Sequence, residues 1–515
     1  MRIGIDVGGT NTDAVLMNGQ EVLAAVKQST LDDVTEGITS ALAALRKAYD
    51  YNPADISAMM IGTTHFINAL VEARNLAPTA AIRLGLPATA SLPPLVGWPE
   101  RLVTAIKGRS YLAHGGHEFD GRLISPLVED EIKNAATDMA DNGVTSVAIS
   151  SVFSPINDEL ELTAKSILQA ELGDSVAISL SSEIGRVGLL ERENATIINA
   201  ALRSLADHII GGLTQRLKSD GYDCELYLSQ NDGTLMDVGY ARKYPVATFA
   251  SGPTNSMRGA AVTSGLATCA VVDVGGTTSD VGVLTNGFPR EATTEVTVAG
   301  VRTNFRMPDV LSVGIGGGSH IVGTEVGPKS VGYRLSSEAL VFGGSTLTAT
   351  DIAVAAGRAD IGDPDRVSHL ERSFVDDVLE RIAARVADTV ERMRTSPDPL
   401  PVVAVGGGAI LLPDSFDGLG EVHRPENAGV ANAIGAAIAQ VSGEIDRVYA
   451  IADGQRSTII DEAQEEARTR AISAGATAES VEIVEFDEVP IPYLPGNATR
   501  IRAKAVGDLA VENAR

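Results

Sequence analysis

The segment Asp6-Val7-Gly8-Gly9-Thr10-Asn11-Thr12-Asp13 decides the fold, because it returns almost unchanged as Asp273-Val274-Gly275-Gly276-Thr277-Thr278-Ser279-Asp280. The first five residues are identical in the two copies, and both copies end in aspartate. Each copy lies between two apolar runs, which is the pattern of a strand, a glycine turn and a second strand. The sequence therefore predicts a duplicated chain with a glycine-tipped hairpin in each half.

The glycine tips have the composition of phosphate-binding loops. Backbone N–H groups approach phosphate oxygens closely where Cβ is missing, and threonine hydroxyls add donors. Asp6 and Asp273, at the strand ends, are predicted to be catalytic through a hydrated Mg²⁺, which prefers oxygen ligands. A single copy would equally fit an ordinary tight hairpin. Two copies, followed by the strand and triple-glycine turn at 402–408, predict MgATP, with the third segment holding the adenosine.

The predicted ATP-binding residues come from these three segments. They are Gly8, Gly9, Thr10, Asn11, Thr12, Gly275, Gly276, Thr277, Thr278, Gly406, Gly407 and Gly408.

Length and charge restrict the class of protein. At 515 residues the chain exceeds the size of a single core, so two or more domains are expected. Acidic residues outnumber basic ones by 67 to 41, which makes nucleic acid and anionic membranes poor partners. No apolar run approaches the roughly 18 residues of a membrane span, so we expect a cytoplasmic protein. The only cysteines, Cys224 and Cys269, are too few for a disulfide framework or an iron-sulfur cluster.

Apolar periodicity predicts an alternation of helices and strands and a small α+β tail. The expected helices are 34–47, 66–72, 129–142, 189–217 with a break at Gly211-Gly212, 375–393, 428–441 and 459–474. The expected division is 1–185 as the first lobe, 186–260 as a helical connection, 261–445 as the second lobe and 446–515 as the tail.

Several further motifs carry a resemblance to a known family. They are Gly62 to His65 with Asn68 to Leu70, Ser251-Gly252-Pro253, Gly316 to Ser319, Val326-Gly327-Pro328, Val405 to Ala409 and 493–500. With the two loops, they resemble the actin, heat-shock and sugar-kinase superfamily, in which two related ribonuclease H-like lobes close over ATP. More narrowly, the chain is similar to the short A-type subunits of the hydantoinase/oxoprolinase family. Long members continue with a large C-terminal segment, and here the small tail stands in its place.

The resemblance implies ATP-dependent opening of a cyclic amide such as a hydantoin, 5-oxoproline or a lactam. Phosphorylation of the amide oxygen makes that oxygen a leaving group, so no covalent nucleophile is needed. We also expect an oligomer. Members of the family frequently use a separately encoded second subunit, and the sequence leaves open whether this chain acts alone. The predicted substrate residues are Thr63, Thr64, Asn68, Gly317 and Gly318. Thr63 and Thr64 fit a strand exit and helix cap equally well.

A histidine-rich loop suggests a second metal. His114 and His117 precede Asp120 at ligand spacing, and together with His65 they could hold Zn²⁺, Mn²⁺ or Fe²⁺. The same loop also fits a polar turn capped by its histidines, so both interpretations stay open.

Other functions fit the two loops as well. A sugar kinase has a similar first loop, although the two isolated cysteines cannot form the zinc motif of many such kinases. An ATPase switch that acts on a partner protein is a different class, whose dimer-bridging cysteines are not matched here. ATP-dependent carboxylation of a ketone lies within the same family, and the sequence does not separate it from amide opening.

Overall fold

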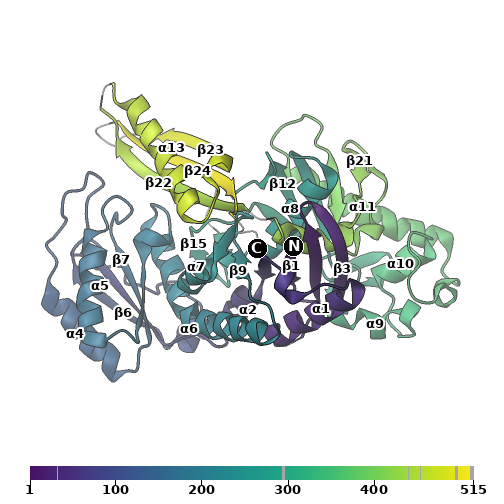
Figure 1. Ribbon diagram of the computed structural model, residues 1–515, viewed down its shortest axis with the longest axis horizontal. Helices are drawn as coiled ribbons and strands as arrows, with labels where there is room; N and C mark the ends of the chain where they lie inside the picture. Colours follow the sequence, from purple (N-terminus) through teal and green to yellow (C-terminus); the bar gives the residue numbers. More distant parts are fainter. Residues whose placement is uncertain (32, 293–295, 439, 453, 493–496, 511–515) are drawn as a thin grey trace.

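The computed structural model describes residues 1–31, 33–292, 296–438, 440–452, 454–492 and 497–510. Figure 1 shows a small sheet with its helices at the left, the second lobe at the right and the C-terminal tail above. The strands of the first lobe lie between these parts. The predicted α/β class is confirmed by this mixture of sheets and covering helices.

The two lobes repeat one strand arrangement. In each lobe, the antiparallel hairpin that carries the glycine turn is extended on one side by an antiparallel strand. On the other side it is extended by two parallel strands. The first lobe has β3 (Glu21–Ser29), β2 (Asn11–Asn18), β1 (Arg2–Val7), β4 (Ala58–Thr63) and β9 (Glu225–Ser229). The second has β16 (Val310–Val313), β12 (Ser279–Thr285), β11 (Cys269–Val274), β19 (Val402–Val405) and β21 (Gly420–His423). The predicted duplication is therefore present strand by strand.

Amphipathic helices cover the two sheets. Helix α1 (Val34–Ala48) begins where the Asp33 carboxylate accepts the amides of Thr35 and Glu36 at 2.8 and 3.1 Å. Helix α11 (Arg372–Met393) buries Val375, Val378, Leu379, Ile382 and Val386. This spacing of three and four residues places one apolar stripe against the sheet of the second lobe. Both helices are where the sequence predicts them.

A separate four-stranded sheet lies between β4 and β9 in the chain. Its strands are all parallel, in the order β6 (Arg109–His114), β5 (Thr79–Leu86), β7 (Ser146–Ser151) and β8 (Ala177–Leu180). Helices α4 (Glu129–Asp141) and α5 (Glu159–Leu172) pack on it. The predicted first lobe, 1–185, thus contains two sheets.

Helix α6 (Leu189–Ser219) corrects the prediction of a break at Gly211-Gly212, because it runs unbroken for 31 residues. Glycine costs a helix about 1 kcal/mol each relative to alanine. Buried Ile210, Leu213 and Leu217 on both sides of the pair hold the helix to the core, so tertiary packing outweighs that cost.

Two helices cross in backbone contact between the lobes. Helix α8 (Ser251–Ser264) packs against strands of both lobes and against α12 (Ala431–Ala436). A Cβ on Gly259 would stand 1.8 Å from the Ala431 carbonyl oxygen, so only glycine permits this crossing. The predicted helix 428–441 is wrong in length, because α12 ends at Ala436 and a strand begins at Gln440.

The tail is an α+β unit whose strands continue the sheet of the first lobe. Strand β22 (Gln440–Ala450) pairs with β10 (Leu235–Asp237), and β24 (Ala498–Asp508) and β23 (Glu482–Pro490) follow it. Helix α13 (Arg456–Ser473) covers them. The predicted boundaries at 260/261 and 445/446 therefore fall inside α8 and β22. Residues 493–496 of the motif at 493–500 lie outside the described residues.

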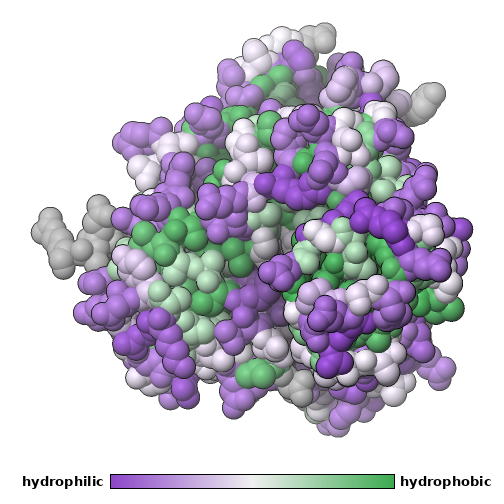
Figure 2. Space-filling view, turned by 90° about the vertical axis from the view of Figure 1, so that its right-hand side faces the viewer, coloured by the Kyte–Doolittle hydropathy of each residue, from purple (hydrophilic) through white to green (hydrophobic). Residues whose placement is uncertain are grey.

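The molecular surface is mixed in polarity. Figure 2 shows separate apolar patches among polar side chains on the face toward the second lobe. Exposed apolar side chains of that lobe include Val322, Tyr333 and Phe342. Scattered apolar groups of this kind are ordinary on a water-facing surface. Among the described residues, no helix is both long and apolar enough to cross a membrane.

Candidate active site

The two glycine loops adopt the same turn and meet at the boundary of the lobes. The Gly8 amide donates to the Asn11 carbonyl at 3.0 Å, and the Gly275 amide donates to the Thr278 carbonyl at 2.9 Å. A Cβ on Gly276 would lie 3.7 Å from the Thr10 side chain. The repeated octapeptide therefore folds twice into one turn, and the tips face each other.

The loop tips offer unused backbone donors. Over the described ranges, the amides of Gly9, Thr10, Gly276 and Thr277 donate no hydrogen bond. A Cβ on Gly9 would meet no atom within 4 Å. Free amides in a glycine turn form a concave site for an anion. The tips thus fit phosphate oxygens approaching from the space between the lobes.

One aspartate stands behind each loop. Asp6 is 4% exposed and Asp273 is half-buried. Burial disfavours the charged form and raises the pKa of each carboxyl to about 6. The two carboxyls also repel each other across the lobes, which adds to the rise in the pKa of Asp6. Paired carboxylates of this kind suit a divalent cation, which replaces the missing positive charge.

Helix α8 contacts both aspartates through neighbouring residues. Asn255 donates to Oδ1 of Asp6 at 3.0 Å, and a hydrogen bond from the Ser256 hydroxyl offsets part of the rise in the pKa of Asp273 that burial causes. A Cβ on Gly62 would stand 2.3 Å from Oδ1 of Asp6, so this glycine leaves room for the contact. From α12, Asn432 donates to Oδ2 of Asp6 at 3.0 Å. The crossing helices therefore fix the carboxylates of both lobes.

A second aspartate closes each repeated segment. Asp13 is 2% exposed and binds Lys27, whose ammonium lies 2.7 and 2.8 Å from its two oxygens. Asp280 accepts the Ser312 hydroxyl at 2.5 Å. Sequence reasoning missed Lys27, Asn255 and Asn432. Two signals in the sequence point toward these residues. The repeated Asp13 calls for a partner, which is Lys27, and the Ser251-Gly252-Pro253 motif comes just before Asn255.

The triple glycine at 406–408 lies beside the second loop, and its predicted contact with adenosine stays a prediction. Gly406 has a φ of +82°, and a Cβ there would stand 2.3 Å from Oδ1 of Asp273. The Gly408 amide donates to the Val274 carbonyl at 2.8 Å. Around Gly407, a Cβ would meet nothing within 4 Å. The middle glycine thus faces open space next to the loop.

The other triple glycine corrects a prediction, because it supports the second loop from behind. Gly316, Gly317 and Gly318 are buried. The Gly317 and Gly318 amides donate to the carbonyls of Gly275 and Gly276 at 2.9 and 2.7 Å. These donors are occupied by the loop, so Gly317 and Gly318 position the phosphate-binding backbone and are not free for a substrate.

The predicted substrate residues of the first lobe lie next to the first loop. Thr63 pairs in register with Val7, and its amide donates to Ser251 at 3.2 Å. The Thr64 amide donates to the Val7 carbonyl at 3.4 Å. Asn68 is exposed on α2 (His65–Glu72) and donates to the Thr64 hydroxyl at 3.4 Å. These residues adjoin the end of β1 that leads into the first loop, and their predicted contact with substrate stays a prediction.

The predicted second metal site is not formed. His114 binds Glu131 at 2.7 Å, and Asp120 pairs with Arg122 at 2.7 Å. His117 is buried with a lowered pKa, and His65 lies in α2, outside the small sheet. No three His, Cys, Asp or Glu side chains of the described chain are grouped to hold a metal. In this turn His114 and Asp120 thus have other partners, while the Nδ1 atom of His117 is buried without a hydrogen bond in the described part of the chain.

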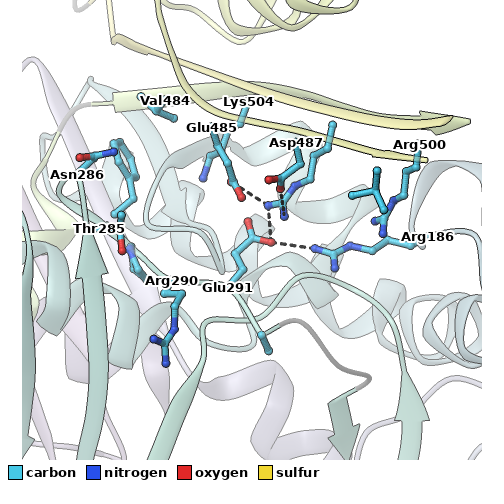
Figure 3. Close-up of a pocket in the computed structure, with 15 residues that line it drawn as sticks. Arg186, Thr285, Asn286, Arg290, Glu291, Val484, Glu485, Asp487, Arg500 and Lys504 are labelled. Atoms are coloured by element: carbon cyan, nitrogen blue, oxygen red, sulfur yellow. Dashed lines mark hydrogen bonds and ion pairs between the residues drawn. The ribbon is translucent and has the colours of Figure 1, made fainter. Parts of the chain in front are cut away.

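A cavity of about 380 Å³ lies at the far end of β12, between the second lobe and the tail. Figure 3 shows Glu291 at its centre, with its carboxylate facing Arg186. Glu291 contacts Arg186 at 2.8 Å and Arg502 at 2.6 Å. Thr285, at this end of β12, is five residues from Asp280, which is roughly 17 Å along a strand. The Glu291–Arg502 pair joins the tail to the second lobe, and the Glu291–Arg186 pair joins the segment before α6 to it, away from the phosphate loops.

Comparison with known proteins decides the family. The hydantoinase/oxoprolinase N-terminal region matches residues 2–172, and the hydantoinase/oxoprolinase model matches residues 192–392. The chain belongs to the hydantoinase/oxoprolinase family. Between them, these two matches contain both phosphate loops, 6–13 and 273–280.

Two curated relatives of this family member are named as enzyme subunits. The chain is 29% identical to the caprolactamase alpha subunit of Pseudomonas jessenii over 76% of its own length and 60% of that protein. It is 27% identical to the acetophenone carboxylase gamma subunit of Aromatoleum aromaticum over 69% of its length and 53% of that protein. The chain thus spans about half to three fifths of these relatives.

Solved structures show the same fold. The ATP-dependent caprolactamase of P. jessenii matches with a TM-score of 0.79 at 19% identity, covering 98% of this chain and 87% of that one. Nucleotide-free acetone carboxylase matches with a TM-score of 0.68 at 17% identity, covering 100% of this chain and 88% of that one. At these identities the likeness concerns the fold alone.

Proposed function

We propose that the chain binds MgATP between its two phosphate loops and uses it to open a cyclic amide such as a hydantoin, 5-oxoproline or a lactam. The observation that carries the proposal is the pairing of Asp6 and Asp273 across the lobes, each behind a loop with unused amides. Family membership and the 29% identity to a caprolactamase subunit support the amide as substrate.

Each part of the cleft has a role in this proposal. The amides of Gly9, Thr10, Gly276 and Thr277 bind phosphate oxygens, and the open space at Gly407 receives the adenosine. Asp6 and Asp273 hold Mg²⁺, which supplies neutralisation of the negative charge that develops during phosphoryl transfer. Asn255, Asn432 and Ser256 keep both carboxylates in place. Thr63 and Thr64 border the substrate.

The chemistry balances without a protein nucleophile. The amide oxygen attacks the terminal phosphorus, ADP leaves, and the ring carbon becomes electron-poor. Water adds to that carbon, the C–N ring bond breaks, and the nitrogen departs with a proton. A second water cleaves the resulting acyl phosphate at carbon and releases phosphate. Positioning and charge neutralisation, which the loops and aspartates provide, are the main demands of the first step.

Carboxylation of a ketone is the second candidate. The 27% identity to an acetophenone carboxylase subunit favours it, and both chemistries need the same phosphorylation site. Both curated relatives are named as subunits, so we propose that a separately encoded second subunit completes the enzyme.

Phosphate release tests the proposal. Hydantoins, 5-oxoproline, lactams, sugars and ketones with bicarbonate are screened with MgATP, with and without the neighbouring-gene product. We expect phosphate release together with a ring-opened acid, and ¹⁸O placed in the amide should appear in phosphate. A carboxylated ketone would support the second candidate, and a phosphorylated sugar or turnover driven only by a partner protein would contradict both. Label found wholly in the carboxylate would exclude this route.

A further inference from the structure

Lys27 places an ammonium group among the aspartates of the cleft. It lies on edge strand β3 directly opposite Asp13, and its side chain is 39% exposed. Its charge reaches across the lobe boundary, because it also acts on Asp273 of the second loop. Lys27 therefore lies within charge range of the second loop, in surroundings where the charges of Asp6, Asp13, Asp273 and Asp280 also act on one another.

The duplicated lobe shows that an ammonium is not required to complete the fold at this position. Asp280 is the counterpart of Asp13, and Ser312 stands opposite it on β16 as Lys27 stands opposite Asp13 on β3. The Ser312 hydroxyl is sufficient to partner Asp280. A lysine in the first lobe thus brings a positive charge that the second lobe does without.

Asp13 has a second partner that stays in place if Lys27 moves. Asn432 donates to Oδ2 of Asp13 at 2.8 Å while it also binds Asp6. A lysine stem is long and flexible, and its ammonium is a compact point charge suited to phosphate. After departure of Lys27, Oδ2 of Asp13 keeps the Asn432 donor, while the buried Oδ1 loses its ammonium contact.

We propose that Lys27 is a ligand of the terminal phosphate of ATP and turns from Asp13 toward it when MgATP enters the cleft. The inference rests on the proposed MgATP site. The aspartates and the triphosphate carry charge of the same sign, and backbone amides supply only partial positive charge. Lys27 offsets this repulsion at the end of the nucleotide that reacts, so it distinguishes ATP from ADP.

Calorimetry of the full chain with MgATP and MgADP tests this role in Lys27→Met and Lys27→Ser, the second of which copies the other lobe. A hydrogen bond to a charged group corresponds to roughly 10- to 100-fold in affinity. We expect MgATP to bind at least about tenfold more weakly and MgADP to change by less than about threefold. Lys27→Arg, which keeps the charge, should retain most of the preference for MgATP.

Ser312→Ala is the matched control, and the ratio of the two affinities should stay at the wild-type value. Equal weakening of MgATP and MgADP in Lys27→Met, or no weakening, would overturn the proposal. Thermal unfolding shows whether Lys27→Met is misfolded. If it is, the ratio of MgATP to MgADP affinity in Lys27→Arg and Lys27→Ser decides whether the proposal holds. If the wild-type chain binds neither nucleotide, the proposed MgATP site itself has failed.

Discussion

The two phosphate loops share a sequence and a turn, but their aspartates have different partners. In the first lobe, carboxamides and an ammonium serve Asp6 and Asp13, namely Asn255, Asn432 and Lys27. In the second, hydroxyls of Ser256 and Ser312 serve Asp273 and Asp280. The octapeptide thus determines the backbone turn, and the surrounding elements determine how firmly its carboxylates are held.

The difference also affects access. Both oxygens of Asp6 accept a carboxamide N–H, and the residue is almost fully buried. Asp273 is half-buried and has a hydroxyl partner, which can rotate away. We infer that the first loop holds a rigid carboxylate and the second brings a more accessible one to the metal. The following variants test this division of roles.

The largest effect is expected at Gly406, next to the second carboxylate. Gly406→Ala places a methyl group 2.3 Å from Oδ1 of Asp273 on a backbone with positive φ. Displacement of the loop should lower substrate-dependent phosphate release by at least about 100-fold, because misplacement near 1 Å costs that much. The measurement is phosphate release at saturating MgATP.

Gly407→Ala is the matched control, because its methyl group meets no protein atom within 4 Å. This variant should unfold at the wild-type temperature, and any loss of its activity should come from weaker nucleotide binding. Equal activity of Gly406→Ala and wild type would show that the second carboxylate is not held as described.

A smaller effect is expected from pH. The pKa of Asp6 and that of Asp273 are both raised to about 6 by burial, and a protonated carboxyl does not bind Mg²⁺. Mg²⁺-dependent ATP affinity should be full above pH 7 and fall by up to about tenfold per pH unit for each carboxyl below pH 6. Calorimetry between pH 5 and 8 measures it, and ATP without Mg²⁺ is the reference.

For the metal-free chain, the raised pKa values of Asp6 and Asp273 make the free energy of unfolding fall, and not rise, with increasing pH. Because the folded-state pKa values lie above the unfolded ones, the folded chain retains protons that the unfolded chain has released. Stability from these two groups is present near pH 4 and is lost as pH rises through 6.

Mg²⁺-dependent ATP affinity that stays flat from pH 5 to 7 would contradict the raised pKa values of Asp6 and Asp273 and their role in binding Mg²⁺.

Local sequence predicts the loops well because a glycine turn between two apolar strands depends on few neighbours. It does not predict Asn432, which reaches Asp6 from 426 residues away.

Tertiary packing also outweighs local sequence patterns in two helices. Gly211 and Gly212 stay within α6 because Ile210 and Leu213 beside them are buried, and 440–441 leave the predicted helix because β24 offers a strand partner.

The histidine loop shows the limit of spacing as a guide. His114, His117 and Asp120 stand at ligand intervals, but a short interval does not fix the direction of a side chain. Glu131 and Arg122 engage two of the three. The triple glycine at 316–318 was misjudged for a related reason, because glycine permits close approach to a protein backbone as readily as to a ligand.

Binding of MgATP to Asp6→Asn and Asp273→Asn tests the central claim that both loops hold one nucleotide. Both changes keep the size of the side chain and remove a charge that Mg²⁺ needs. Calorimetry should give one MgATP per wild-type chain and at least about 100-fold weaker binding in each variant. Mg²⁺-free ATP should bind each variant at least as tightly as wild type, because the change removes a carboxylate charge that repels the triphosphate. Wild-type affinity for MgATP in either variant would contradict a site shared between the lobes.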